Sequence, residues 1–281
     1  MQHYLSSLKR PLQQLQEDLY LLNNELVINY VDIDQDHSSQ RDTDLEQSKK
    51  LLNITNEYEE QGKHVFHILS TEWENPQLQN IWKSMIEYKL GQCKRIFARQ
   101  CTKQVLTPKE AKTFCLDNHI QGFKGGSIYE GLYYGSELVM VVIFGKSRYN
   151  KDIDLELIRL CTKKGLCVVG GASKLLKPYS FLSYGNRRWC NKNNNVYHHL
   201  ADLIYLSDPC YYYNNNGKLY HRSSYMKHKL KDKLEYFNPD DTEVNNCYAN
   251  GLTRIWDVGC VVYVKHFDND VSFIPRKVTR Q

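Results

Sequence analysis

Short apolar runs separated by polar residues and glycines follow one another along the chain, a pattern typical of a fold that mixes helices and strands. Compact runs such as 25–30 and 64–69 predict strands. Runs with apolar residues every three to four positions, such as 80–90, predict amphipathic helices. Over the first third the pattern predicts strands at 15–22 and 25–30, a loop over 31–48 and a helix over 51–61. A strand over 64–69 and a helix over 80–90 follow.

The remaining two thirds continue this mixture. Thr107 followed by Pro108 and Glu110 predicts a helix start, with a capping hydroxyl, a proline in the first turn and an acid at the third position. The predicted elements begin with a helix over 107–118, a hairpin of 128–134 with 137–144, and a strand over 155–162. A turn and helix from 170, a strand over 180–184 and a helix over 195–201 come next. The last elements are a strand pair of 209–213 with 219–221, a helix over 226–237 and a strand over 259–264. This order of elements predicts a mixed fold of the broad α/β class, with the α+β arrangement.

Composition narrows the class of protein. The chain has 281 residues, of which 41% are hydrophobic and 25% charged, so we expect a globular protein. Its apolar runs are far shorter than a membrane span, and its first residues lack the apolar core of a signal peptide, so we expect no membrane association and a cytoplasmic location. The nine cysteines form no CxxC pair, which predicts reduced thiols rather than disulfides or a zinc ribbon.

Charge divides the chain near Gly91. Residues 1–92 hold 8 basic and 15 acidic side chains, a balance of −7, whereas residues 93–281 hold 29 basic and 17 acidic ones, a balance of +12. We therefore expect two domains with this boundary. The basic domain suits DNA or another nucleic acid, and the acidic domain suits a protein partner.

Two segments of the acidic domain carry a resemblance. They are Glu17 to Tyr30, EDLYLLNNELVINY, and 56–73, NEYEEQGKHVFHILSTEW. Together they resemble the nuclease domain of phage homing endonucleases related to very-short-patch-repair enzymes, of the PD-(D/E)xK class with an EDxHD signature. The resemblance implies a small PD-(D/E)xK-like domain over 1–92 that holds Mg²⁺ through two carboxylates.

The chain departs from this family at one of those carboxylates. Asp18 matches the first, but Asn29 stands at the second, and an amide removes one anionic oxygen from a Mg²⁺ site. We therefore expect a degenerate nuclease domain, kept for structure or partner contact. The alternative is a site rebuilt from Asp18, with His37 as the base and Asp32 or Asp34 as a further metal ligand.

A strand-like run leads into Gly170-Gly171-Ala172-Ser173 and then Lys174, where a helical pattern begins. Glycines let the backbone approach a ligand closely, and the free N–H groups at a helix start favour phosphate. In that case a side chain at Gly171 should block the ligand and leave the fold largely intact. The alternative is a tight turn whose glycines only solve a packing problem.

The order of elements after residue 93 resembles the GNAT acyltransferase fold, whose glycine turn binds the pyrophosphate of acyl-coenzyme A. Gly170 and Ala172 meet the family pattern, whereas its Arg or Gln position is Cys167. Collinear motifs also resemble the C-terminal domain of the same phage endonucleases, at 118–123, 131–134, 144–151, 156–161, 168–175, 183–189 and 254–259. The resemblance implies a basic, GNAT-like mixed-sheet domain over 93–281.

Four more side chains are candidates for chemistry. Arg148, Arg187 and Arg188 lie beside glycine turns and a strand end, where arginine can grip phosphate with two nitrogens; the alternative is a solvated surface. His119 follows the helix over 107–118, and it is either a general base or a polar residue that finishes this helix.

We therefore expect a phage or mobile-element protein that associates with DNA, in the host cytoplasm if a phage encodes it. Its nuclease site is expected to be degenerate and its basic domain to bind nucleic acid. One alternative is an active Mg²⁺-dependent endonuclease. Another is an acyltransferase that uses acyl-CoA to modify a nucleobase or an amine, and a third is a structural or interaction role.

Overall fold

The computed structural model describes residues 1–33, 41–147 and 153–266, which form a mixed arrangement of helices and strands. The chain divides into two compact units. Unit 1 comprises Met1–Glu74, Asn186–Trp189 and Asp208–Cys260, and unit 2 comprises Asn75–Gly185, Cys190–Ser207 and the chain from Val261 onward. These units do not coincide with the expected domains 1–92 and 93–281, because unit 1 draws on both. No helix in the described part of the chain has the length and apolar character needed to cross a membrane.

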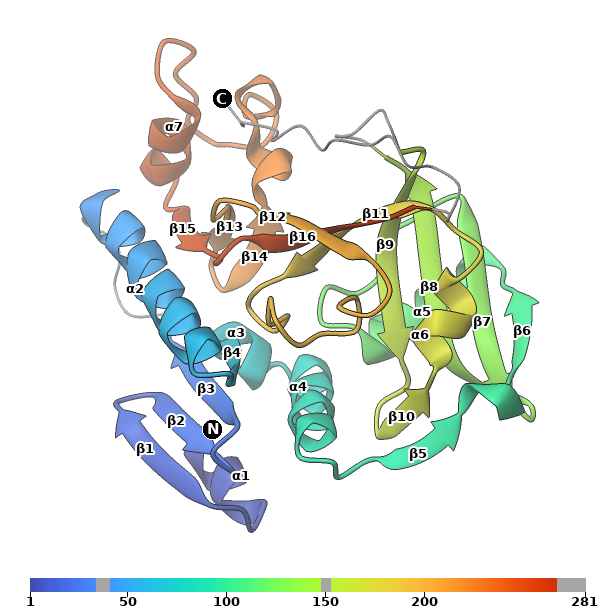
Figure 1. Cartoon of the computed structure of the whole chain (residues 1–281). Helices are drawn as coiled ribbons and strands as arrows, with labels where there is room; N and C mark the ends of the chain where they lie inside the picture. The colour runs from blue at the N-terminus through green and yellow to red at the C-terminus, as the bar shows by residue number, and fades with distance from the viewer. Residues whose placement is uncertain (34–40, 148–152, 267–281) are drawn as a thin grey trace. The chain divides into compact units, whose positions relative to one another are not determined.

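The first sheet of unit 1 has four strands in the order β1-β2-β3-β4 (Figure 1). Their bounds are Leu12–Gln16, Leu19–Leu22, Leu26–Val31 and His64–Leu69. The first three strands are antiparallel neighbours, and β4 runs parallel to β3. The helix α2 (Arg41–Glu60) makes the crossover between them, α1 (Gln2–Ser7) precedes the sheet, and α3 (Ser70–Glu74) follows it.

Local signals account for most of this sheet. Asn23 and Asn24 form the predicted turn, with φ of 53° and 57°, a left-handed conformation that asparagine tolerates. The strand predicted over 15–22 is divided in two, because Asp18 also has a left-handed φ of 60°. The strand over 64–69 is confirmed, and Gly62 ends the preceding helix at φ 74°. Apolar side chains of β2, β3 and β4 pack with Ile54 of α2.

The rest of unit 1 contains a second sheet of three strands, in the order β14-β13-β15. The strands are Lys218–His221, Tyr211–Asn215 and Thr253–Trp256, accompanied by α7 (Glu243–Ala249) and two short 3₁₀ turns, η2 (Arg222–Tyr225) and η3 (Lys227–Lys229). The helix predicted over 226–237 is wrong. The side chain of Asn250 accepts from the backbone N–H of Tyr236 and donates to its carbonyl, so these two groups bond a side chain instead of a helix backbone.

Unit 2 is built on a seven-stranded sheet, in the order β12-β16-β11-β9-β8-β7-β6 (Figure 1). In chain order the strands are β6 (Thr102–Val105), β7 (Ile128–Tyr134), β8 (Glu137–Lys146), β9 (Leu155–Thr162), β11 (Phe181–Asn186), β12 (Asp202–Leu206) and β16 (Cys260–Lys265). A separate parallel pair joins β5 (Lys94–Phe97) to β10 (Leu166–Val169), and η1 (Ala98–Gln100) follows β5. The helices are α4 (Pro76–Lys89), α5 (Pro108–Asn118) and α6 (Gly171–Leu176).

The predicted start of α5 is confirmed in detail. The hydroxyl of Thr107 accepts from the backbone N–H of Glu110, while the Glu110 carboxylate accepts from the N–H of Thr107. The hairpin of β7 and β8 is confirmed as well. In contrast, the segment predicted as a helix over 195–201 contains only turns, because the side chain of Asn195 accepts from the N–H of Tyr197 and donates to the carbonyl of Asn191.

Gly171 is a packing position within unit 2. The residue is buried, and a Cβ there would lie 2.6 Å from the Met140 sulfur and 2.9 Å from a methyl of Val168. Gly170, in contrast, is exposed and has a φ of 76°, which side-chain-bearing residues rarely adopt. The turn therefore needs glycine at 170 for its conformation and at 171 for its packing.

Replacing Gly171 with valine should lower the stability of unit 2 by about 1–3 kcal/mol, since the added methyls overpack the contact with Met140. The expected signature is a melting temperature several degrees lower by circular dichroism. Ser173→Ala, at an exposed position two residues on, is the matched control and should change little. A Gly171→Val protein that melts like the wild type would contradict this packing role.

Candidate functional site

The candidate nuclease centre lies on the first sheet of unit 1, where Asp18 stands at the bend between β1 and β2. The carbonyl of Asp18 accepts from the N–H of Tyr30 at 2.8 Å, and its neighbour Leu19 pairs with Asn29 on β3. Partial burial raises the pKa of the Asp18 carboxyl, and the charges of Glu17 and Asp32 raise it further. The sheet thus brings Asp18 near Asp32 and beside Asn29.

These carboxylates do not make a recognisable metal centre by themselves. Among the residues that the structure describes, no three His, Cys, Asp or Glu side chains come together as a metal ion requires. Asp34 and His37, which the rebuilt site would use, lie outside the described residues, as does Arg148. Asp18 and Asp32 are the described part of that proposed Mg²⁺ site.

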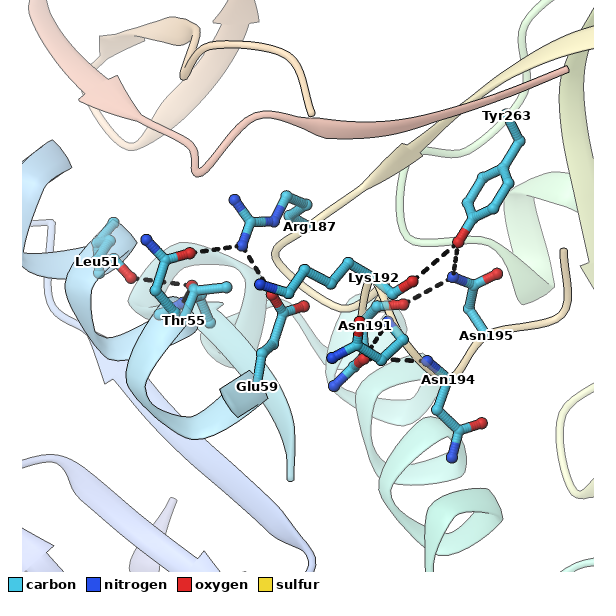
Figure 2. A network of polar contacts seen from close by, with 12 residues as sticks. Leu51, Thr55, Glu59, Arg187, Asn191, Lys192, Asn194, Asn195 and Tyr263 are labelled. Atoms are coloured by element: carbon cyan, nitrogen blue, oxygen red, sulfur yellow. Dashed lines mark hydrogen bonds and ion pairs between the residues drawn. The ribbon is translucent and has the colours of Figure 1, made fainter. Parts of the chain in front are cut away.

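Asn29 belongs to a buried chain of hydrogen bonds that runs from β3 through β4 to α2. Its Nδ2 lies 2.9 Å from Nδ1 of His67, and Nε2 of His67 lies 2.7 Å from the hydroxyl of Thr55. The Thr55 hydroxyl donates its proton to the carbonyl of Leu51 at 2.9 Å (Figure 2). Thr55 must therefore accept from His67, and the imidazole must carry its proton on Nε2 and accept from Asn29 on Nδ1.

This arrangement holds His67 neutral. Burial lowers the pKa of His67 to about 3, and the charges of Arg188 and Arg187 lower it further. A neutral imidazole with its proton on Nε2 needs a donor at Nδ1, which an amide supplies and a carboxylate does not. The amide of Asn29 is consequently committed to His67, and the position has a structural role that a carboxylate cannot fill while the imidazole stays neutral.

Arg187 is buried in an ion pair with α2. One of its terminal nitrogens donates to the Glu59 carboxylate at 2.7 Å and to the Asn56 side chain at 2.9 Å (Figure 2). Arg187 and Glu59 have side chains that are 3% and 1% exposed. In addition, the backbone N–H of Arg187 donates to the carbonyl of Gly259 at 3.0 Å.

Arg188 forms a second buried ion pair, with Glu72 of α3. Its two terminal nitrogens contact both carboxylate oxygens of Glu72, one of them at 2.9 Å, and it also donates to the carbonyl of His67 at 3.0 and 3.2 Å. In return the N–H of His67 donates to the carbonyl of Arg188 at 2.9 Å. Burial opposes the charged form, but the Glu72 carboxylate outweighs it and raises the pKa of Arg188 on balance.

The expectation that Arg187 and Arg188 grip nucleic-acid phosphates is therefore corrected. Both guanidinium groups are buried within unit 1, where carboxylates already neutralise them. The Arg188 pair is supported by further hydrogen bonds to the His67 carbonyl, whereas Arg187 adds a single side-chain bond to Asn56 and leaves its buried Nε without a partner among the described residues. These arginines position β4, α2 and α3 and are not exposed to a ligand.

The glycine turn of unit 2 was the candidate anion site. The ammonium of Lys174 donates to the carbonyls of Ala98 and Cys101, at 2.9 and 2.6 Å, so it fastens α6 to η1. Ala172 is buried and Ser173 is exposed. The turn therefore presents Gly170 and Ser173 to the surface, while the ammonium of Lys174 is hydrogen-bonded to backbone carbonyls.

This geometry does not favour acyl-coenzyme A. A Cβ at Gly171 would meet Met140 and Val168, so this residue faces the interior of unit 2 and not a ligand. The position of the expected arginine or glutamine is Cys167, whose backbone belongs to the β10–β5 pair.

His119 is the C-cap of α5, and its backbone N–H bonds the carbonyl of Cys115. Its Nδ1 accepts from the N–H of Gln121 at 3.0 Å. Burial and the nearby Arg159 lower the pKa of His119 to about 3, so the imidazole is a weak base. These contacts fit the alternative in which His119 finishes the helix.

The loop over 190–201, between β11 and β12, is organised by asparagines in unit 2. The side chain of Asn191 accepts from the N–H groups of Asn193 and Asn194, and Asn195 donates to the Tyr263 hydroxyl at 2.7 Å (Figure 2). Tyr197 bonds Ser183 of β11, and burial raises the pKa of its hydroxyl well above its usual range. The loop is thus held by its own side chains and by β11 and β16.

Comparison with known proteins adds little to this geometry. No protein-family model matches the chain. A curated protein, the lectin-like protein EP153R of African swine fever virus (isolate Tick/South Africa/Pretoriuskop Pr4/1996), is 22% identical over 126 residues. The match spans 43% of this chain and 76% of the viral protein. This similarity is too weak to place the chain in a family.

The sequence motif found Asp18 and Asn29 but missed the residues that decide the role of Asn29. These are Thr55, Glu59, His67 and Glu72, all buried. A signal for two of them was present: Thr55 and Glu59 follow Leu51 at intervals of four, so they continue the buried face of a helix with polar groups. Such a stripe indicates buried polar partners elsewhere in the chain.

Unit 1 should lose stability in acid through His67. Unfolded histidine takes up a proton below its ordinary pKa of 6.5, whereas folded His67 resists protonation down to about pH 3. Its contribution to stability is therefore complete above pH 6.5 and falls as the pH drops from 6.5 towards 3, by at most about 1.4 kcal/mol per pH unit.

The matched variant is His67→Gln, since glutamine offers an acceptor and a donor but does not titrate. Between pH 7 and pH 5 the wild type should lose about 2 kcal/mol more unfolding free energy than His67→Gln in urea titrations. His3→Gln, at an exposed site, serves as the control and should behave as the wild type. Parallel pH profiles for the wild type and His67→Gln would contradict the neutral assignment.

Removing one partner of the Arg188–Glu72 ion pair should strongly lower the free energy of unfolding. Arg188→Met leaves the Glu72 carboxylate buried without its cation, and we expect a loss of about 3–5 kcal/mol in urea unfolding. The double variant Arg188→Met with Glu72→Met should recover much of that loss, because no lone charge remains. Unchanged stability together with weakened DNA binding would instead restore the phosphate-contact interpretation of Arg188.

Proposed function

We propose that this chain is a nucleic-acid-binding protein of nuclease descent that no longer cuts its ligand. The observation that carries the proposal is the commitment of the Asn29 amide to His67, at the position where the related endonucleases use a metal-binding carboxylate. The α1-β1-β2-β3-α2-β4 order of unit 1, with β4 parallel to β3, supports a PD-(D/E)xK-like ancestry.

A duplex-cutting site of this class uses Mg²⁺ held by several anionic oxygens. In this chain Asp18 retains such an oxygen, but Asn29 cannot supply a second one while its amide donates to His67. Exchanging the amide for a carboxylate would place an acceptor against the acceptor Nδ1, which requires a second proton on His67. The charges of Arg187 and Arg188 oppose that proton.

Nucleic-acid binding is supported by charge. Residues 93–281 hold 29 basic and 17 acidic side chains, an imbalance that favours a polyanionic partner. A GNAT-like origin of unit 2 is supported by its antiparallel β7-β8-β9 meander, the glycine turn with α6, and the return of β11 parallel to β9. We propose that this fold is kept as a scaffold and not as an acyltransferase, because Cys167 stands at the arginine or glutamine position and the Lys174 ammonium is bonded to the carbonyls of Ala98 and Cys101.

The proposal predicts binding without cleavage. With Mg²⁺ or Mn²⁺, the full-length protein should leave supercoiled plasmid intact, because the metal site lacks a ligand. In the same buffer it should retard a duplex in gels, with an affinity that falls at least tenfold over a few-fold rise in salt as counterions are released. Asp18→Ala should leave this binding unchanged.

Two results would contradict the proposal. Robust plasmid cleavage that disappears in Asp18→Ala would establish the active-endonuclease alternative. Absence of binding to any nucleic acid at low salt would leave the structural or interaction role as the better interpretation.

A further inference from the structure

A strongly basic stretch of unit 1, residues 218–233, lies outside the candidate nuclease centre and outside the glycine turn. We call it the basic segment. It comprises β14, η2, η3 and the turn that follows, and it contains one acid, Asp232. Its basic residues are Lys218, His221, Arg222, Lys227, His228, Lys229, Lys231 and Lys233.

Tyrosine rings hold several of these cations in place. Lys218 lies 5.2 Å from the ring centre of Tyr220, and Lys233 lies 5.3 Å from that of Tyr225. The two rings contact each other edge to face at 5.5 Å. A chain of contacts therefore links cations from the two ends of the basic segment, although they are fifteen positions apart in the sequence.

Backbone carbonyls fix the turn between those ends. The ammonium of Lys229 donates to the carbonyl of Ser223, and that of Lys233 donates to the carbonyl of Ser224, both at 2.8 Å. These bonds fold η3 back onto η2. Lys227, His228 and Lys231 are exposed on the same short stretch. The result is an ordered turn that presents these three side chains to solvent, while Arg222 of the same segment is paired with Glu243 at 3.7 Å.

We propose that the basic segment is the surface through which this protein contacts the phosphate backbone of duplex DNA. The inference rests on the proposed nucleic-acid-binding function and replaces Arg187 and Arg188 as its contact residues. Lysines on an ordered surface act as point charges towards phosphates, and they need no base-specific geometry.

The tyrosines favour a duplex over a single strand. Single-strand surfaces combine positive charge with open aromatic faces on which bases stack. Here Tyr220 and Tyr225 are covered by lysines and by each other, and Tyr225 is only 7% exposed. The basic segment thus presents lysine charges to a ligand and not open aromatic faces on which bases could stack. Tyr236, which is 59% exposed, follows three residues after the segment and provides a test of the single-strand alternative.

The experiment compares two triple variants of the full-length chain by fluorescence anisotropy with a duplex of mixed sequence, about 30 base pairs long, which exceeds the footprint of a single module. The first variant carries Lys218→Gln, Lys227→Gln and Lys231→Gln, which removes exposed charges and spares the lysines that bond carbonyls. The matched control carries Lys109→Gln, Lys112→Gln and Lys177→Gln, three exposed lysines of unit 2. Both proteins should keep the wild-type melting temperature, because the altered side chains are exposed.

The first variant should bind the duplex at least tenfold more weakly, and its log–log salt slope should become shallower by about 0.9 for each phosphate that the protein no longer neutralises. The control should bind within about twofold of the wild type. Equal losses of affinity in the two triple variants, or wild-type affinity in the first, would overturn the assignment while leaving the proposed function standing. Tighter binding to a single strand than to the duplex, abolished in Tyr236→Ala, would overturn the choice of duplex. A wild type that binds no nucleic acid removes both proposals together.

Discussion

Two adjacent buried arginines organise unit 1. Arg187 and Arg188 insert one guanidinium against α2 and another against α3, and each meets a carboxylate that would otherwise be buried alone. Removing one partner of either pair leaves the other charge buried in a medium of low dielectric, which lowers the stability of unit 1. They also place the backbone of β4, because Arg188 both accepts from and donates to the peptide of His67.

The chemistry of the neighbouring site follows from this constraint. Burial, and after it the positive charges of Arg188 and Arg187, lower the pKa of His67 and favour its neutral imidazole. The neutral ring donates from Nε2 to Thr55, and its Nδ1 lone pair accepts from the Asn29 amide. The amide of Asn29 is therefore one member of a set of matched donors and acceptors that also includes His67 and Thr55. A carboxylate at position 29 would need a second proton on His67, which burial and the two arginine charges both oppose.

Local sequence signals predicted the elements whose stabilising contacts are themselves local. The capped start of α5 and the β7–β8 hairpin are examples. The helix expected over 226–237 failed because lysine and asparagine side chains bind its backbone carbonyls and those of the turn before it. The pairing of Arg187 with Glu59 spans 128 residues, so no local pattern contains it, and the motif that found Asp18 and Asn29 had no means of finding His67.

The discontinuity of unit 1 also bears on how the chain emerges from the ribosome. Glu59 and Glu72 are synthesised 128 and 116 residues before the arginines that neutralise them. At about 5–20 residues per second, each carboxylate waits roughly 6–25 s for its partner. During that interval Val31, Leu51 and Leu69 lack their packing partners Ile255 and Val258, so the core of unit 1 stays open until residues 186–260 have been made.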